Sequence, residues 1–176
     1  TLVVSPLIAL MSDQVNKWNS VFSCSVEGPI VRSSNPTRNV AVLLGSAQLD
    51  SQVAADAEQG LYPVVYVAPE TLAYFSPSLL SKVRVLVVYE CHCISEHGQS
   101  FRPAYRTIRT FFKGVRTIAL TATASPEVEQ DILSNLEMVR PLVIRTSMHR
   151  PNLRLWVRQK RGPALDLVEI QNHVQS

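Results

Sequence analysis

The chain has 176 residues, of which 46% are hydrophobic and 18% are charged, and this composition excludes an intrinsically disordered protein. The length fits one domain with a continuous core, and no apolar stretch is long enough to span a bilayer. The net charge of +3 is uneven, because residues 102–176 carry twelve basic against six acidic groups and residues 1–101 carry five against eight.

Apolar runs that suit buried strands alternate with helical patterns along most of the chain. In chain order, these patterns predict a strand at 2–4, a helix at 7–18, a strand at 40–44, a helix at 49–59, strands at 64–67 and 83–88, a helix at 103–112, a strand at 115–120, a helix at 125–136 and a strand at 142–145. Strands that alternate with helices imply right-handed crossovers and a parallel sheet, so the expected fold class is α/β.

Two regions fit this alternation less well. Residues 19–39 are rich in Ser, Asn, Pro and Arg and are expected to form a long surface insertion. Beyond residue 150, a strand-like stretch at 153–157 and a basic run at 158–161 precede an expected helix at 163–173. The first residue is Thr1, not Met, so we expect the chain to be a segment of a longer protein.

The distribution of charge and the number of cysteines indicate which partners and which cellular compartment suit the chain. The positive second half favours a polyanionic partner, although arginines on solvated helix faces would give the same count. Three cysteines, Cys24, Cys91 and Cys93, suit a reducing compartment better than a disulfide framework. A zinc site at Cys91, His92, Cys93 and His97 is conceivable, but the C-x-C spacing lacks a second ligand pair, and packing at a strand end is favoured.

Polar clusters directly follow four of the expected strands. They are Ser5-Pro6, Ala68-Pro69-Glu70, Glu90-Cys91-His92 and Thr121-Ala122-Thr123. In a parallel sheet all four lie at the same edge, where open α/β sheets bind their ligands. Each cluster taken singly is equally well explained as a turn or a helix cap.

Short motifs, in the same order as in the family, cover nearly the whole chain and resemble the RecQ family of superfamily 2 helicases. Their residues are most similar to those of the Werner-type branch. They are VVSPLIALM at 3–11, LGSAQ at 44–48, YVAPE at 66–70, YECHCISEHG at 89–98, ALTATA at 119–124 and MHRPNL at 148–153. The resemblance implies part of a first RecA-like helicase domain at 1–149, truncated at its N-terminus, and a junction with the start of a second RecA-like domain at 150–176.

The resemblance also implies residue roles. Glu90 corresponds to the catalytic base that activates the attacking water, and His92 corresponds to the residue that relays nucleotide state to Thr121 and Thr123. Contacts with single-stranded DNA are implied for Ser5, Pro6, Leu7, Ala68, Pro69, Glu70, Phe101 and Arg102, with Tyr105 as a further aromatic contact.

Two departures from the family pattern concern its cofactors, ATP and Mg²⁺. Tyr89 stands where the family has a Mg²⁺-associated Asp, and a neutral, bulkier phenol cannot offset the charge of the metal. No G-x-x-x-x-G-K-[ST] motif occurs in the chain, and we expect that phosphate-binding loop to lie upstream of Thr1. The loop at 97–102 has also lost the leading Trp of the family.

The resemblance implies ATP-dependent 3′-to-5′ unwinding of DNA in recombination and repair. Its implied partners are single-stranded DNA, duplex junctions and a second RecA-like domain, with no membrane, in the nucleus if eukaryotic and otherwise in the cytoplasm. This chain alone is expected to be inactive. Two alternatives stay open: a catalytically dead pseudo-helicase that binds DNA or protein, and an insoluble fragment with an unpaired sheet edge.

Overall fold

The computed structural model describes residues 1–22, 39–45, 51–97, 100–147, 150–154, 157, 159–160, 162, 167 and 170–171. The chain divides into two compact units, Thr1–Pro141 and Leu142–Ser176. Compactness alone does not test the expected boundary between family domains after residue 149. No helix among the described residues is long and apolar enough to cross a membrane.

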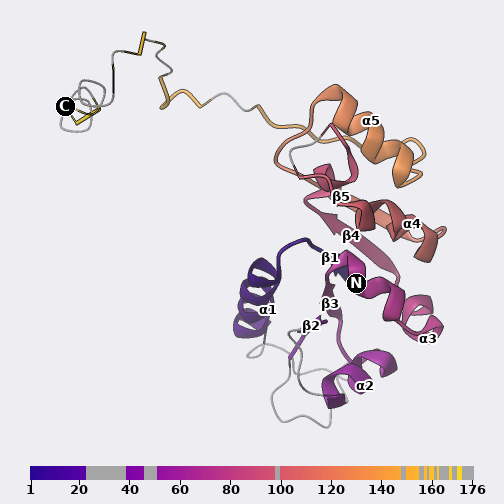
Figure 1. Cartoon of the computed structure of the whole chain (residues 1–176). Coiled ribbons are helices and arrows are strands. Elements are labelled where there is room, and N and C mark those ends of the chain that lie inside the picture. Colours follow the sequence, from indigo (N-terminus) through magenta and orange to yellow (C-terminus); the bar gives the residue numbers. More distant parts are fainter. Residues whose placement is uncertain are drawn as a thin grey trace. The chain divides into compact units, whose positions relative to one another are not determined.

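The first unit is built on a five-stranded parallel sheet (Figure 1). Its strands are β1 (Leu2–Val4), β2 (Ala41–Leu44), β3 (Val64–Val67), β4 (Val85–Tyr89) and β5 (Arg116–Leu120). The spatial order is β2-β3-β1-β4-β5, and every neighbouring pair is parallel. The predicted α/β class with a parallel sheet is therefore confirmed, and each of these strands lies within two residues of its predicted bounds.

The register brings the last residues of the strands to one level. Val4 lies opposite Val67 on one side and Val88 on the other, and Tyr89 lies opposite Leu120. The segments that follow β1, β3, β4 and β5 therefore leave the sheet at one edge, which we call the carboxyl edge.

Helices cover both faces of the sheet. They are α1 (Ile8–Phe22), α2 (Ser51–Gln59), α3 (Pro77–Ser81), α4 (Ile108–Phe111) and α5 (Pro126–Asn135), with 3₁₀ turns η1 (Pro69–Tyr74), η2 (Cys91–Ile94) and η3 (Pro103–Thr107). Met11 of α1 packs in a small cluster on one face, and the other helices contribute to the larger core on the opposite face. Figure 1 shows α1 apart from α2, α3 and α4, with the sheet between them.

The first helix is longer than predicted. The sequence placed its end at Trp18 and the start of a surface insertion at residue 19, but α1 continues to Phe22. Trp18 and Phe22 lie one helical turn apart, and their rings stack with centroids 5.0 Å apart. Asn19 also pairs with the backbone of Val40 and Ala41 at the β2 edge, which anchors this last turn. Residues 23–38 of the expected insertion lie outside the described residues.

Two helices begin at Ser-Pro pairs. Ser125 accepts a hydrogen bond from the Val128 N–H at the start of α5, as the sequence predicted, and Ser76 accepts one from the Leu79 N–H at the start of α3. The prediction at 103–112 was right in position, but this segment is divided between η3 and α4.

The predicted strand at 142–145 is absent, and this prediction was wrong. Residues 141–147 have no regular secondary structure, and Leu142 and Ile144 are 86% and 81% exposed. A strand exists only where a neighbour accepts its backbone hydrogen bonds, and the described sheet ends at β5. Of the expected strand at 153–157, residues 153, 154 and 157 are described and are not strand. In the expected helix at 163–173, Leu167, Ile170 and Gln171 are helical, and the other residues lie outside the described part.

Candidate functional site

The carboxyl edge brings the four polar clusters together, as the sequence predicted. Glu90 is the first residue after β4, and it has a left-handed backbone with φ 51°. A non-glycine residue rarely adopts this conformation, and such strain is concentrated at functional sites. The turn at Glu90 directs the chain into η2 and places His92 beside the end of β5.

His92 links the end of β4 to the end of β5. Its Nδ1 lies 2.8 Å from Oγ1 of Thr121 and 3.2 Å from a carboxylate oxygen of Glu90. The Thr121 hydroxyl donates its proton to the Thr123 carbonyl oxygen at 3.0 Å and accepts from the Thr123 N–H at 3.2 Å. Since that hydroxyl has one proton, Nδ1 of His92 is the donor to Thr121 in the tautomer that keeps the bond to the Thr123 carbonyl oxygen. Glu90, His92, Thr121 and Thr123 therefore form one connected network.

Tyr89 ends β4 with its side chain half-buried. Its carbonyl oxygen accepts a hydrogen bond from the hydroxyl of Tyr105 at 2.9 Å. Tyr105 is fully buried, so it is a core residue and not the DNA-stacking ring that the sequence suggested. Burial also raises the pKa of its phenol. Tyr105, Ile108 and Phe112 recur at helical spacing, and this pattern could have revealed the core role.

Neither hydrogen-bond donor of Ser5 is accessible to a DNA phosphate. Its side chain is 1% exposed, and its hydroxyl has no hydrogen-bond partner. Its N–H donates to the Val67 carbonyl oxygen at 3.0 Å, as part of the pairing between β1 and β3. This placement argues against the direct phosphate contact that the resemblance implied for Ser5.

The other residues of the first two clusters for which DNA contacts were predicted differ in their exposure to solvent. Leu7 is 58% exposed just before α1, and Glu70 is exposed in the first turn of η1. Pro6 and Ala68 are half-buried, and Pro69 is buried. Among these predicted DNA residues, therefore, Leu7 and Glu70 are the exposed ones.

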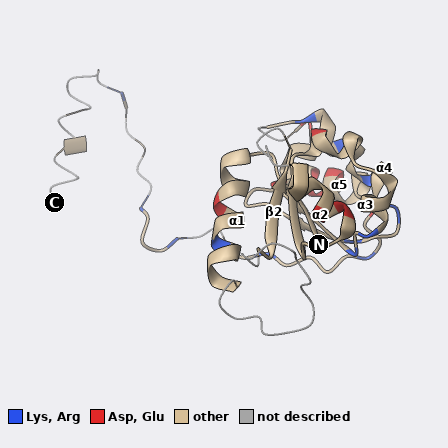
Figure 2. Ribbon diagram, turned by 90° about the horizontal axis from the view of Figure 1, so that it is seen from below, with Lys and Arg blue, Asp and Glu red and all other residues tan. Residues whose placement is uncertain are grey.

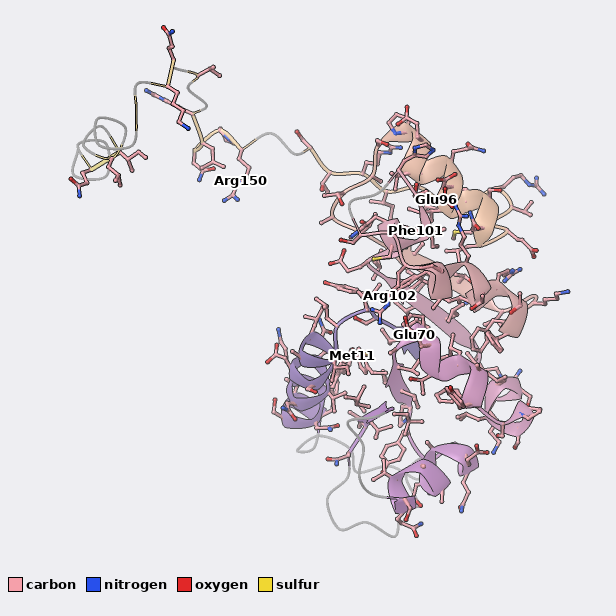
Figure 3. All side chains as sticks on the ribbon, viewed as in Figure 1. Met11, Glu70, Glu96, Phe101, Arg102 and Arg150 are labelled. Atoms are coloured by element: carbon pink, nitrogen blue, oxygen red, sulfur yellow. The ribbon has the colours of Figure 1, made fainter. Side chains whose placement is uncertain are left out.

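Arg102 ties these two segments together. Its guanidinium donates to both carboxylate oxygens of Glu70, at 2.6 and 3.0 Å, and to the Pro6 carbonyl oxygen at 2.6 Å. Figure 3 shows Arg102 and Glu70 side by side at this edge. Arg102 is therefore an ion-pair partner, and the acid that it binds is Glu70 rather than Glu90 or Glu96, which lie nearer to it in the sequence.

Three arginines between residues 102 and 109 are neutralised by acidic side chains of the first unit. Arg102, Arg106 and Arg109 form ion pairs with Glu70, Glu96 and Glu137, respectively. Figure 2 shows both signs of charge on the first unit. These three arginines therefore do not add free positive charge to the carboxyl edge, whereas Lys113, Arg116 and Arg140 of the first unit are exposed.

The two described cysteines are packing residues. Cys91 and Cys93 are buried in the larger core, which raises the pKa of both thiols, to about 12 for Cys91. A metal ligand must be a thiolate, so this environment opposes the zinc alternative. Cys24 lies outside the described residues.

The residues of this chain do not fit Mg²⁺-ATP by themselves. Mg²⁺ prefers carboxylate oxygens, and the strand-end position carries Tyr89. Within the described ranges, no three His, Cys, Asp or Glu side chains gather closely enough to hold a metal ion. No G-x-x-x-x-G-K-[ST] loop is present in the sequence to cradle phosphates.

Comparison with known proteins identifies the family. The DEAD/DEAH box helicase family model matches residues 1–132. The chain is 33% identical over 180 residues to the ATP-dependent DNA helicase Q-like SIM of Arabidopsis thaliana, covering 91% of this chain and 19% of that protein. It is 36% identical over 173 residues to the mouse bifunctional 3′-5′ exonuclease/ATP-dependent helicase WRN, covering 93% and 11%. It is 34% identical over 169 residues to the ATP-dependent DNA helicase RecQ of Pasteurella multocida, covering 93% and 25%.

A solved structure supports the fold. The helicase domain of Hef from Pyrococcus furiosus superposes with a TM-score of 0.51 at 19% identity, over 78% of this chain and 27% of that one. The chain spans a quarter or less of the length of the three relatives named above. The matched family model, the RecA-like sheet and the ordered motifs agree: the chain belongs to the DEAD/DEAH box helicases and is RecQ-like within them.

Proposed function

We propose that the protein containing this chain is an ATP-dependent DNA helicase of the RecQ type with 3′-to-5′ polarity. The observation that carries the proposal is the network in which His92 joins Glu90 to Thr121 at the carboxyl edge. It connects the residue in the position of the catalytic base to the segment after β5. Exposed Leu7 and Phe101 lie on segments that leave the same edge.

Within that protein, Glu90 serves as the base and His92 with Thr121 and Thr123 couples nucleotide state to the sheet edge. ATP and Mg²⁺ supply the phosphoryl chemistry when they are bound. The present residues do not fit that group alone, so we propose that other parts of the protein, including a second RecA-like domain, complete its site. In a eukaryotic cell we place the protein in the nucleus, where its DNA substrate lies.

A second candidate function is a DNA-binding module without turnover. Tyr89 favours it, because a phenol at the strand-end position cannot replace a carboxylate toward a metal. The Glu90 carboxylate also lies against His92 in this structure, 3.2 Å away. A protein with this second function would still bind DNA through the exposed residues of the carboxyl edge, but it would not hydrolyse ATP.

Unwinding of a 3′-tailed duplex by the full-length protein separates the two functions. Unwinding that requires ATP supports the helicase, whereas DNA binding without ATP hydrolysis supports the module. A full-length protein that neither unwinds nor binds DNA would contradict both.

The carboxyl edge itself is tested with the 176-residue chain and a fluorescent oligothymidine. Fluorescence anisotropy should show weak binding that falls steeply with salt, because phosphate contacts release counterions. Phe101→Ala should cost about 1–3 kcal/mol through loss of one stacking platform. Phe22→Ala is a matched control, since Phe22 and Phe101 are both 39% exposed but Phe22 is the last of the fifteen residues of α1. Equal loss from both variants would show that the edge has no special role.

A further inference from the structure

Phe101 stands out among the aromatic rings that follow β4. Tyr105 and Phe112 are buried and Phe111 is half-buried, whereas Phe101 is 39% exposed. A ring with this exposure needs support to keep one orientation, because an unsupported side chain on a surface segment samples several rotamers.

Arg106 provides that support from η3. Its guanidinium carbon lies 5.0 Å from the centroid of the Phe101 ring, within the range of a cation–π contact. Two hydrogen bonds orient the guanidinium: Nε donates to the Ile94 carbonyl oxygen at 3.1 Å, and Nη1 donates to Glu96 at 2.9 Å. Ile94 is fully buried, so the arginine is anchored to the core at one side. Figure 3 shows Glu96 and Phe101 close together.

The charge of Arg106 is already balanced. Glu96 forms an ion pair with it, so Arg106 differs from a free surface cation that attracts phosphates. Its guanidinium instead lies over the Phe101 ring, where a cation is attracted by the face of the ring.

We propose that Arg106 is a positioning residue that holds the Phe101 ring as a stacking platform for one base of single-stranded DNA. This inference rests on the proposed function and deepens it at the carboxyl edge. The motif at 89–98 includes Glu96, but no motif includes Arg106, whose contact with Phe101 arises from the 3₁₀ turn.

The test compares two probes with the same phosphates: an oligothymidine and an oligomer of equal length without bases. Arg106→Ala should weaken oligothymidine binding about two- to fivefold, as expected for an exposed cation–π contact. Phe101→Ala should weaken it more, by about fivefold or greater. The double variant should bind no more weakly than Phe101→Ala, and none of the three changes should affect the base-free oligomer. Arg84→Ala is the charge-matched control, since Arg84 is exposed before the start of β4, at the opposite end of the sheet.

The salt dependence separates positioning from phosphate binding. A positioning role leaves the slope of log affinity against log salt unchanged in Arg106→Ala. A slope that falls by about one unit, with equal loss on the base-free oligomer, would make Arg106 a phosphate ligand and overturn the inference. Circular dichroism checks folding. Should Arg106→Ala unfold, Arg106→Lys decides, because a lysine keeps the charge but cannot hold both anchors and lie flat under the ring. Wild-type affinity in Arg106→Lys would then overturn the inference.

The two proposals fail in different ways. If Phe101→Ala weakens binding and Arg106→Ala does not, only the positioning role is lost. If the unaltered chain does not bind oligothymidine, or Phe101→Ala has no effect, the DNA-binding edge itself is wrong and the positioning role falls with it.

Discussion

Arg102 and Glu70 form a two-pronged ion pair that joins the segment before η3 to the first turn of η1. The same guanidinium reaches the Pro6 carbonyl oxygen, so one side chain braces the segments that follow β1 and β3. Both partners are partly exposed, and such pairs contribute little to stability on their own. The main consequence is electrostatic, because Glu70 cancels the charge of Arg102 at the proposed DNA edge.

Glu70→Gln should therefore strengthen DNA binding and steepen its salt dependence by up to about one unit. Removal of the carboxylate leaves Arg102 free to neutralise a phosphate. Anisotropy titrations over a salt series measure both quantities. Glu137→Gln is the control, since it frees Arg109 from an equivalent pair beside the amino end of β5. Identical slopes in Glu70→Gln and the unaltered chain would mean that Arg102 does not face DNA.

Thr121→Val should destabilise the fold by about 1–2 kcal/mol, because His92 and the Thr123 N–H lose a partner. Thr123→Val is a close control, since the contacts of Thr123 in this network run through its backbone, and it should stay within about 0.5 kcal/mol of the unaltered chain. Urea unfolding followed by circular dichroism gives both values. Equal stabilities would show that the hydroxyl contributes nothing to the network.

The positions of the five strands along the chain could be predicted from the sequence, because each rests on a local pattern. Their shared edge followed from the expectation of a parallel sheet. Val64 to Val67 and Val85 to Val88 are short runs rich in valine, the first preceded by Pro63 and the second by Arg84. Short apolar runs of this kind are typical of buried parallel strands. Strand 142–145 shows the same local pattern but did not form. A strand forms there only if a neighbouring strand is available to pair with it, and the local sequence does not indicate whether one is present.

The sequence predicted which residues lie at the carboxyl edge, but it did not predict which side chains contact one another there. Motif order placed Glu90, His92 and Thr121 at one edge, and the structure joins them. Partner choice was missed for Arg102, which binds Glu70 from 32 residues away. The burial of Ser5 was missed for a related reason: a polar residue after a strand can face the core, and only packing decides which way it points.

The chain should show no DNA-stimulated ATPase activity with Mg²⁺. The residues needed to cradle phosphates do not occur in it, and Tyr89 offers no carboxylate. Tyr89→Asp alone should not restore turnover, because the phosphate cradle is still missing. Phosphate release is measured with single-stranded DNA against a protein-free control. Release above that control from the unaltered chain would contradict the assignment of Tyr89 to the metal position.

Stability should fall as the pH rises from about 9 towards 12. Burial raises the pKa of Cys91 to about 12, whereas an unfolded thiol titrates near 8.5. Between those values the unfolded chain releases a proton that the native chain keeps, so rising pH favours unfolding. Cys91→Ala should reduce this slope by up to about 1.4 kcal/mol per pH unit, with a remainder from Cys93 and Tyr105, whose pKa values are also raised. Urea midpoints at several pH values test this, and an unchanged slope would place the titration elsewhere.

Ser5→Ala separates a structural from a DNA-binding role at the end of β1. The hydroxyl is buried without a partner, so its removal relieves an unsatisfied polar group and should raise stability by about 1 kcal/mol. The Ser5 N–H bond to Val67 is retained, because it belongs to the backbone. DNA affinity and its salt slope should be unchanged, since neither donor of Ser5 faces solvent. A variant that is more stable and binds DNA normally supports the buried placement. A variant that loses DNA affinity at unchanged stability would show that the hydroxyl turns outward to a phosphate, and would return Ser5 to the DNA-binding residues.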